Sequence, residues 1–81
     1  MYEQINDPVQ VATLFKDGEV KPLKFLWKGK EFLVRSVNLA YSRFEGRAKV
    51  YYFAVSDRNN YFKLQFNSDN LIWTLLESYV D

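Results

Sequence analysis

Hydrophobic and polar side chains alternate along most of this chain. Leu23, Phe25 and Trp27 lie at every second position of one segment, and the same period runs through residues 51–56 and 61–66. Successive side chains of a β-strand point to opposite faces, so a period of two predicts strands with one buried face. The pattern therefore predicts an all-β domain.

Short polar turns divide this pattern at regular intervals. The strongest turn signal is Asp17-Gly18, because an Asp-Gly pair favours the tight turn of a β-hairpin. Further turns are expected near Gly29 and Gly46 and in two later polar runs. The expected strands are residues 9–15, 21–28, 31–41, 47–56, 60–66 and 71–78.

Strands that are joined by short loops pair antiparallel, so these segments predict a meander. The chain has 81 residues, which is enough for one domain. We therefore expect residues 1–81 to form a single small SH3-like or related barrel of five to six antiparallel strands.

The segment at 8–16 fits two interpretations. Asp7 followed by Pro8 is typical of a helix start, with a capping aspartate and a proline at the first helical position. Apolar or β-branched residues also alternate over 9–15, however, and the Asp-Gly turn that follows favours a hairpin. We prefer the strand and keep the helix as the alternative.

The long stretch 31–41 changes phase partway. Val34 belongs to one face, whereas Val37 and the apolar residues after it fall on the other. A bulge near Arg35-Ser36 would turn both sets toward the core and would bend the strand. The predicted core consists of Val11, Leu23, Phe25, Trp27, Phe32, Val34, Val37, Leu39, Tyr51, Phe53, Val55, Phe62, Leu64, Trp73 and Leu75.

The chain contains no histidine and no cysteine. Ser–His and Cys–His catalysis and the usual zinc sites need these residues. The ten acidic residues are scattered and form no calcium-binding loop. We therefore expect no enzymatic activity, no catalytic residue, no metal site and no cofactor. Aromatic residues make up 19% of the chain and are expected to fill a core that no disulfide supports.

The sequence carries no recognisable targeting or membrane segment. Residues 1–7 contain no basic stretch followed by an apolar run, so no signal peptide is predicted. The longest apolar run is far shorter than the roughly 20 residues of a membrane span. The absence of cysteine fits a reducing compartment. We expect a soluble cytoplasmic protein with no membrane partner and no small-molecule substrate.

The net charge of +1 conceals an uneven distribution. Residues 1–20 carry −3, residues 21–63 carry +7 from ten cations and three acids, and residues 64–81 carry −3. Such asymmetry fits an anion-binding surface, but it fits also a sheet in which acidic strands neutralise basic neighbours, and we prefer this second interpretation.

Single-stranded nucleic acid is one possible partner of the basic region, because small β-barrels stack bases on exposed aromatic rings beside cations. The alternative is that the tyrosines form cross-strand pairs covered by lysine stems. Nucleic-acid binding requires the cations to converge on one face, whereas matching by Glu3, Asp7, Glu77 and Asp81 would argue against it. The candidate contact residues for nucleic acid or a protein partner are Lys24, Lys28, Lys30, Tyr41, Arg43, Phe44, Arg47, Lys49 and Tyr52.

Association with a protein partner or with a second copy of the chain is the leading prediction. An open meander leaves two strand edges, and an edge can accept a partner's strand. Residues 2–6 and 79–81 would extend the first and last strands. Leu26, Val50 and Tyr52 on one outer face would form an apolar patch suited to such a contact. We therefore predict a non-catalytic binding or adaptor module.

Residues 8–81 contain a set of short motifs. The motifs are Pro8-Val9-Gln10-Val11, Asp17-Gly18, Pro22-Leu23-Lys24-Phe25-Leu26-Trp27-Lys28-Gly29, Phe32-Leu33-Val34, Tyr52-Phe53-Ala54-Val55, Phe62-Lys63-Leu64, Trp73-Thr74-Leu75 and Asp81. With them the chain resembles a family of short bacterial domains of unknown function. The resemblance implies a bacterial source and a binding or accessory role, and it assigns no functional residue.

Overall fold

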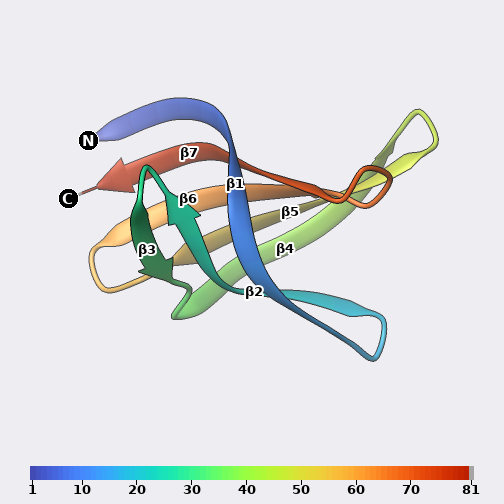
Figure 1. Cartoon of the computed structure of the whole chain (residues 1–81), viewed down its shortest axis with the longest axis horizontal. Coiled ribbons are helices and arrows are strands. Elements are labelled where there is room, and N and C mark those ends of the chain that lie inside the picture. The colour runs from blue at the N-terminus through green and yellow to red at the C-terminus, as the bar shows by residue number, and fades with distance from the viewer. Residues whose placement is uncertain (81) are drawn as a thin grey trace.

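The computed structural model describes residues 1–80, and every element in them is a strand. Figure 1 labels the strands and colours them by their position along the chain. They are β1 (Tyr2–Lys16), β2 (Glu19–Trp27), β3 (Lys30–Leu33), β4 (Ser36–Glu45), β5 (Ala48–Ser56), β6 (Asn60–Asn67) and β7 (Ile72–Val80). Within these residues no helix is long and apolar enough to cross a membrane. The prediction of an all-β chain is confirmed.

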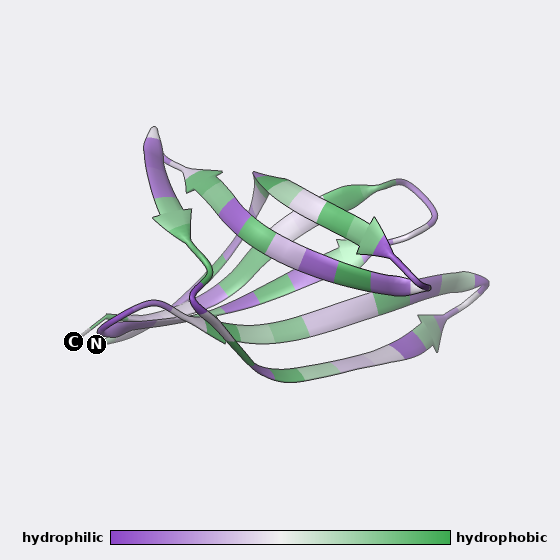
Figure 2. Ribbon diagram, turned by 90° about the horizontal axis from the view of Figure 1, so that it is seen from below, coloured by the Kyte–Doolittle hydropathy of each residue, from purple (hydrophilic) through white to green (hydrophobic). Residues whose placement is uncertain are grey.

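The strands form one antiparallel sheet in the order β3-β2-β1-β7-β6-β5-β4. Two meanders, β1–β3 and β4–β7, are joined where β1 pairs with β7. The sheet is curved, and β2 and β3 lie over the opposite part of the same sheet (Figure 2). The expected barrel of five to six strands therefore differs from the structure in two respects, because there are seven strands and the sheet is open.

The free edges of the sheet are β3 and β4. We had expected them at the first and last strands, but β1 and β7 pair with each other and lie inside the sheet. The segment at 8–16 is strand rather than helix, since β1 begins at Tyr2 and continues to the turn at Asp17-Gly18. Both turn residues have positive φ, 53° and 75°, as a type I′ hairpin turn requires.

The core is a layer of aromatic and aliphatic side chains on the concave face of the sheet. Ring centroids lie 4.8 Å apart between Phe66 and Trp73 and 5.6 Å apart between Phe53 and Trp73. Of the predicted core, Phe25, Phe53, Val55, Phe62, Leu64, Trp73 and Leu75 are buried, and Val11, Trp27, Phe32, Val34 and Tyr51 pack against them while partly exposed. Leu23, Val37 and Leu39 were predicted wrongly, because each is about half exposed.

A bulge explains the exposure of Leu23. On β1, Ala12 pairs with Lys24 and the next residue, Thr13, pairs with Pro22, so β2 has one extra residue between its partners. The extra residue reverses the alternation, and Pro22 becomes buried while Leu23 turns outward.

A change of partner strand explains the exposure of Val37 and Leu39. At Val34 and Arg35 the chain leaves β2 and joins β5, so the expected strand 31–41 is divided into β3 and β4. The bulge comes later than expected, at Asn38, since Val37 pairs with Val55 and Leu39 with Ala54. Every residue of β4 is exposed, and no further strand within residues 1–80 covers this edge.

We expect Trp73→Ala to destabilise the fold by about 3–5 kcal/mol, the usual cost of truncating a buried tryptophan. Trp27→Ala should cost less, because the Trp27 ring is only partly buried and its Nε1–H donates to Asp7 Oδ2 at 3.1 Å. Urea unfolding followed by circular dichroism measures both. An equal loss of stability in the two variants would contradict this ranking.

Candidate functional site

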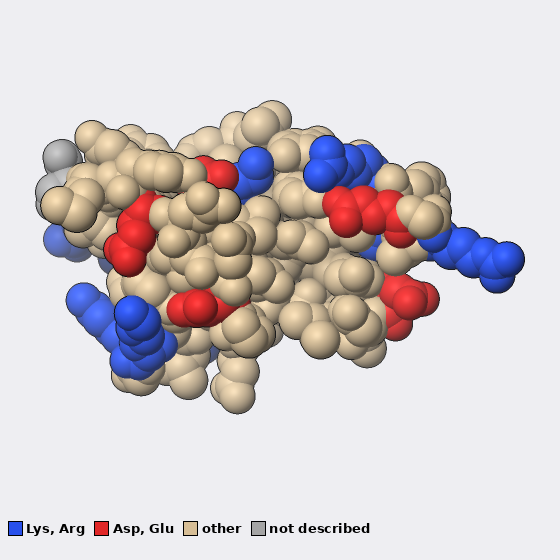
Figure 3. Space-filling model, turned by 90° about the horizontal axis from the view of Figure 1, so that it is seen from above, with Lys and Arg blue, Asp and Glu red and all other residues tan. Residues whose placement is uncertain are grey.

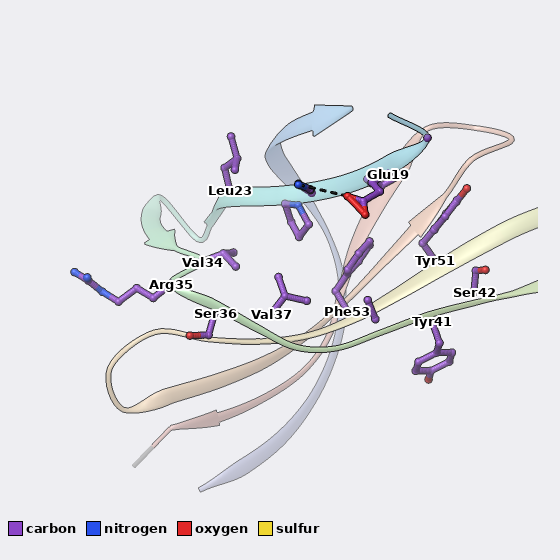
Figure 4. A pocket seen from close by; sticks show the side chains of 15 residues that line it. Glu19, Leu23, Val34, Arg35, Ser36, Val37, Tyr41, Ser42, Tyr51 and Phe53 are labelled. Atoms are coloured by element: carbon purple, nitrogen blue, oxygen red, sulfur yellow. Dashed lines mark ion pairs between the residues drawn. The ribbon is translucent and has the colours of Figure 1, made fainter. Parts of the chain in front are cut away.

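A groove lies between β2 and β4, where the sheet fails to close. Its volume is about 580 Å³. Residues 18–23 form one wall, residues 34–37 and 40–42 form the other, and Tyr51 and Phe53 of β5 form the floor. Figure 4 shows Val34, Val37 and Phe53 projecting into the space between the two strands.

Both walls of this groove are strand edges. β2 pairs with β3 only from Lys24 onward, and β4 pairs with β5 along its other edge. Within residues 1–80, no strand pairs with the groove-facing edge of residues 19–22 or of β4. The backbone N–H and C=O groups of these edges are therefore free to bind another extended chain.

The walls converge at one end of the groove. There, the Val34 N–H donates to the Leu23 carbonyl at 2.9 Å, and the Arg35 N–H donates to the Ser56 carbonyl at 3.0 Å. At the other end, the walls lead toward the β1–β2 and β4–β5 turns. The groove is thus a wedge with one closed end, and Arg35 projects outward from that end (Figure 4).

The lining of the groove is mostly apolar, with few charges on its rim. Lys21 Nζ lies 3.4 Å from Glu19 Oε2, and both side chains are largely exposed. Arg35 has no ion-pair partner within residues 1–80. The same residues hold no group of three or more side chains that could bind a metal ion. This arrangement is suited to binding by shape and backbone hydrogen bonds.

A second constellation lies on the convex face of β4 and β5. The rings of Tyr41 and Tyr52 stack with centroids 5.0 Å apart, and the Arg43 guanidinium lies 5.0 Å from the Tyr52 ring. Lys63 Nζ lies 5.9 Å from the Tyr41 ring and 5.7 Å from the Tyr52 ring. Tyr52 is buried, so the stack exposes only Tyr41.

Hydrogen bonds to Glu45 fix this constellation. The Tyr52 hydroxyl and the Arg43 Nε–H both donate to Glu45 Oε2, the latter at 3.2 Å. Burial raises the pKa of Tyr52, and the hydrogen bond to Glu45 raises it further. The Tyr52 hydrogen bond, followed by the neighbouring Arg43, lowers the pKa of Glu45. The neighbouring Tyr52 hydroxyl, followed by Glu45, raises the pKa of Arg43.

The other predicted contact residues are divided between two hairpins. On the β2–β3 hairpin, Lys24 Nζ lies 3.4 Å from Glu31 Oε2, and Lys28 and Lys30 lie over the rings of Trp27 and Phe32. The structure therefore brings Tyr41, Arg43 and Tyr52 together on β4 and β5, and it places Lys24, Lys28 and Lys30 on a different hairpin.

At the β4–β5 turn, Phe44 and Arg47 are exposed. Lys49 Nζ lies 5.1 Å from the ring of Tyr51, which forms part of the groove floor. The predicted apolar patch of Leu26, Val50 and Tyr52 is not exposed as a unit, because Val50 and Tyr52 are buried.

Positive and negative groups are interspersed on the face that Figure 3 shows. The acids that form ion pairs within residues 1–80 are Glu19, Glu31 and Glu45, none of which was expected to neutralise the basic segment. Of the four expected acids, Asp7 accepts the Trp27 hydrogen bond, and Asp81 lies outside the described residues. The pattern of alternation did not predict the groove, although the phase change in 31–41 marks the point where its walls separate.

Comparison with protein-family models, with curated proteins and with solved structures gives no match.

Tyr52→Phe should destabilise the chain by about 1 kcal/mol at neutral pH, because it removes the hydroxyl that donates to Glu45. The measurement is the free energy of urea unfolding. Tyr61→Phe is the matched control, since the Tyr61 ring is exposed. Equal stability of Tyr52→Phe and the unsubstituted chain would contradict a stabilising role of this hydrogen bond.

Glu45→Gln should lower stability at neutral pH and lose this effect in acid. The pKa of Glu45 is lower in the folded chain than its ordinary value of 4.5, so the carboxylate stabilises the fold above that pH. The contribution disappears as the pH falls through the lowered pKa of the folded state. Melting temperatures between pH 7 and pH 2, with Glu3→Gln as control, test this sign. A difference that grows in acid would contradict it.

Proposed function

We propose that this chain is a non-catalytic binding module that holds an extended segment of a partner protein in the groove between β2 and β4. The observation that carries the proposal is the pair of unpaired strand edges with an apolar floor between them. An extended polypeptide satisfies such edges with its own backbone and places alternate side chains against the floor.

The length and exposure of β4 support this mode of binding. The strand has ten residues, and all of them are exposed. Val37 and Leu39 present half-exposed apolar side chains on it, which a bound segment would shield from water. A bound strand would cover this edge and would bring the open sheet closer to the barrel expected from the sequence.

A free segment of a partner fits the groove better than a second copy of this chain. The β4 strand of a second copy is joined to its own β5, so it would bring a whole sheet with it. A strand between the two walls must instead be free along both of its edges. We therefore propose a partner protein with an exposed, extended segment. The resemblance implies a bacterial source, and the absence of cysteine fits the cytoplasm.

Single-stranded nucleic acid is the alternative occupant of the basic surface, supported by the Tyr41–Tyr52 stack beside Arg43 and Lys63. The division of the other cations between two hairpins argues against it. We expect no micromolar binding of labelled single-stranded DNA or RNA at physiological salt in fluorescence anisotropy. Micromolar binding that weakens steeply with salt would favour the nucleic-acid alternative.

The proposal is tested by selecting binders from a displayed library of random peptides. We expect selected peptides to bind the unsubstituted chain and to lose at least about tenfold in affinity with Val37→Glu, which places a charge against apolar side chains in the groove. Leu14→Glu is the matched control, because Leu14 is exposed to a similar degree on β1 and lies outside the groove. Equal losses in the two variants, or no selected binder, would refute the proposed function.

N-methylation of a selected peptide separates backbone pairing from side-chain contact. A strand paired with β4 turns every second N–H toward β4 and the others toward residues 19–22, where β2 is free of β3. Methylation of the set that faces β4 should therefore abolish binding, and methylation of the other set should weaken it less. Equal tolerance of the two sets in anisotropy measurements would contradict pairing with a strand edge.

A further inference from the structure

A cluster of cations lies beside the closed end of the groove. Lys30, Arg35 and Arg58 line a shallow depression of about 430 Å³, and Arg35 lines the groove as well. The depression therefore continues directly from the site of the proposed function. Two acids, Glu31 and Asp57, also line it.

Both of these acids already have partners. Glu31 Oε2 lies 3.4 Å from Lys24 Nζ, and Asp57 Oδ1 accepts the backbone N–H of Asn60 at 3.0 Å. The two arginines have no ion-pair partner in the part of the chain that the structure describes. The depression is therefore complementary to an additional negative charge.

The topology determines which end of a bound strand reaches these cations. β4 begins at Ser36, at the closed end, and runs toward the open end. The segment cannot be antiparallel to both walls, because β2 and β4 run in opposite directions along the groove. β4 offers a ten-residue edge, whereas β2 is free of β3 only before Lys24, so antiparallel pairing, slightly the more stable per residue, is expected with β4. A segment that pairs antiparallel with β4 therefore has its C-terminal end at Arg35.

We propose that the partner segment carries apolar side chains at alternate positions and acidic side chains at its C-terminal end, bound by Arg35 and Arg58. This proposal rests on the proposed function and specifies the chemistry of the partner. Arginine is suited to the role because its guanidinium binds a carboxylate with two parallel hydrogen bonds. The outward direction of Arg35 places its charge where the segment leaves the groove (Figure 4).

Two synthetic peptides test this inference. Each is acetylated and amidated, begins with alternating valine and threonine, and ends either in two glutamates or in two glutamines. Amidation leaves the glutamate side chains as the only difference in charge. We expect the glutamate peptide to bind about five- to tenfold more tightly at low salt, the effect of one or two exposed ion pairs.

Variants of the protein assign this preference to the two arginines. Arg35→Gln/Arg58→Gln should bind both peptides equally, and Arg35→Glu/Arg58→Glu should prefer a third peptide that ends in two lysines. Arg47→Gln is the matched control, because Arg47 is an exposed arginine at the β4–β5 turn, outside the depression. Melting temperatures of all variants establish that each is folded.

The outcomes separate this inference from the proposed function. Equal binding of the two peptides, lost in Val37→Glu, would overturn the acidic preference and leave the groove as a strand-binding site. A preference that survives in the double arginine variants would also overturn the inference. Failure of both peptides to bind, although library peptides bind the groove, would overturn the inference alone.

Discussion

Three phenylalanine rings hold the β2–β3 hairpin over the opposite part of the sheet, and the groove depends on this contact. The Phe25 ring stacks on Phe32 at 5.2 Å and meets the edge of Phe62 at 5.0 Å, and Phe32 lies 5.2 Å from Phe62. Aromatic pairs at such distances contribute beyond the area that they bury. Without them the hairpin would be tied to the sheet mainly through β1, and β2 would not lie opposite β4.

This contact also explains how so short a chain maintains a curved sheet without a disulfide or a metal. Phe25 and Phe62 come from strands that are three places apart in the sheet order, so their contact closes the curve across the core. On the opposite side of the core, Trp73 lies between Phe53 and Phe66. Large rings fill this small interior with few residues, which accounts for the high aromatic content of the chain.

The sequence was sufficient to predict the class of fold and most of the core. Alternation identified Phe53, Leu64 and Trp73 as buried, because their strands have neighbours on both sides. It failed at Leu23, where a single extra residue reverses the faces of β2. Pro22 beside it was the available signal, because proline within a sheet is confined to edges and bulges.

The predicted contact residues lie together only where they belong to one hairpin. Tyr41 and Tyr52 lie together because they are direct cross-strand partners, and Arg43 is two residues after Tyr41 on the same strand. The register of the hairpin determines these positions. The lysines of the β2–β3 hairpin lie elsewhere, because their position depends on how the sheet curves. Curvature arises from contacts between residues that are distant in the sequence, so charge along the chain cannot reveal it.

The open side of the sheet has a cause within the chain itself. β3 pairs with β2 from Lys24 to Trp27. The chain that follows β3 then crosses to β5 at Val34 and Arg35 and continues as β4. One stretch of chain thus begins as the neighbour of β2 and ends as the neighbour of β5. The groove-facing edge of residues 19–22 is left without a partner strand within residues 1–80. The groove is therefore bounded by two strand edges, and the proposed partner segment would pair there without any rearrangement of the aromatic core.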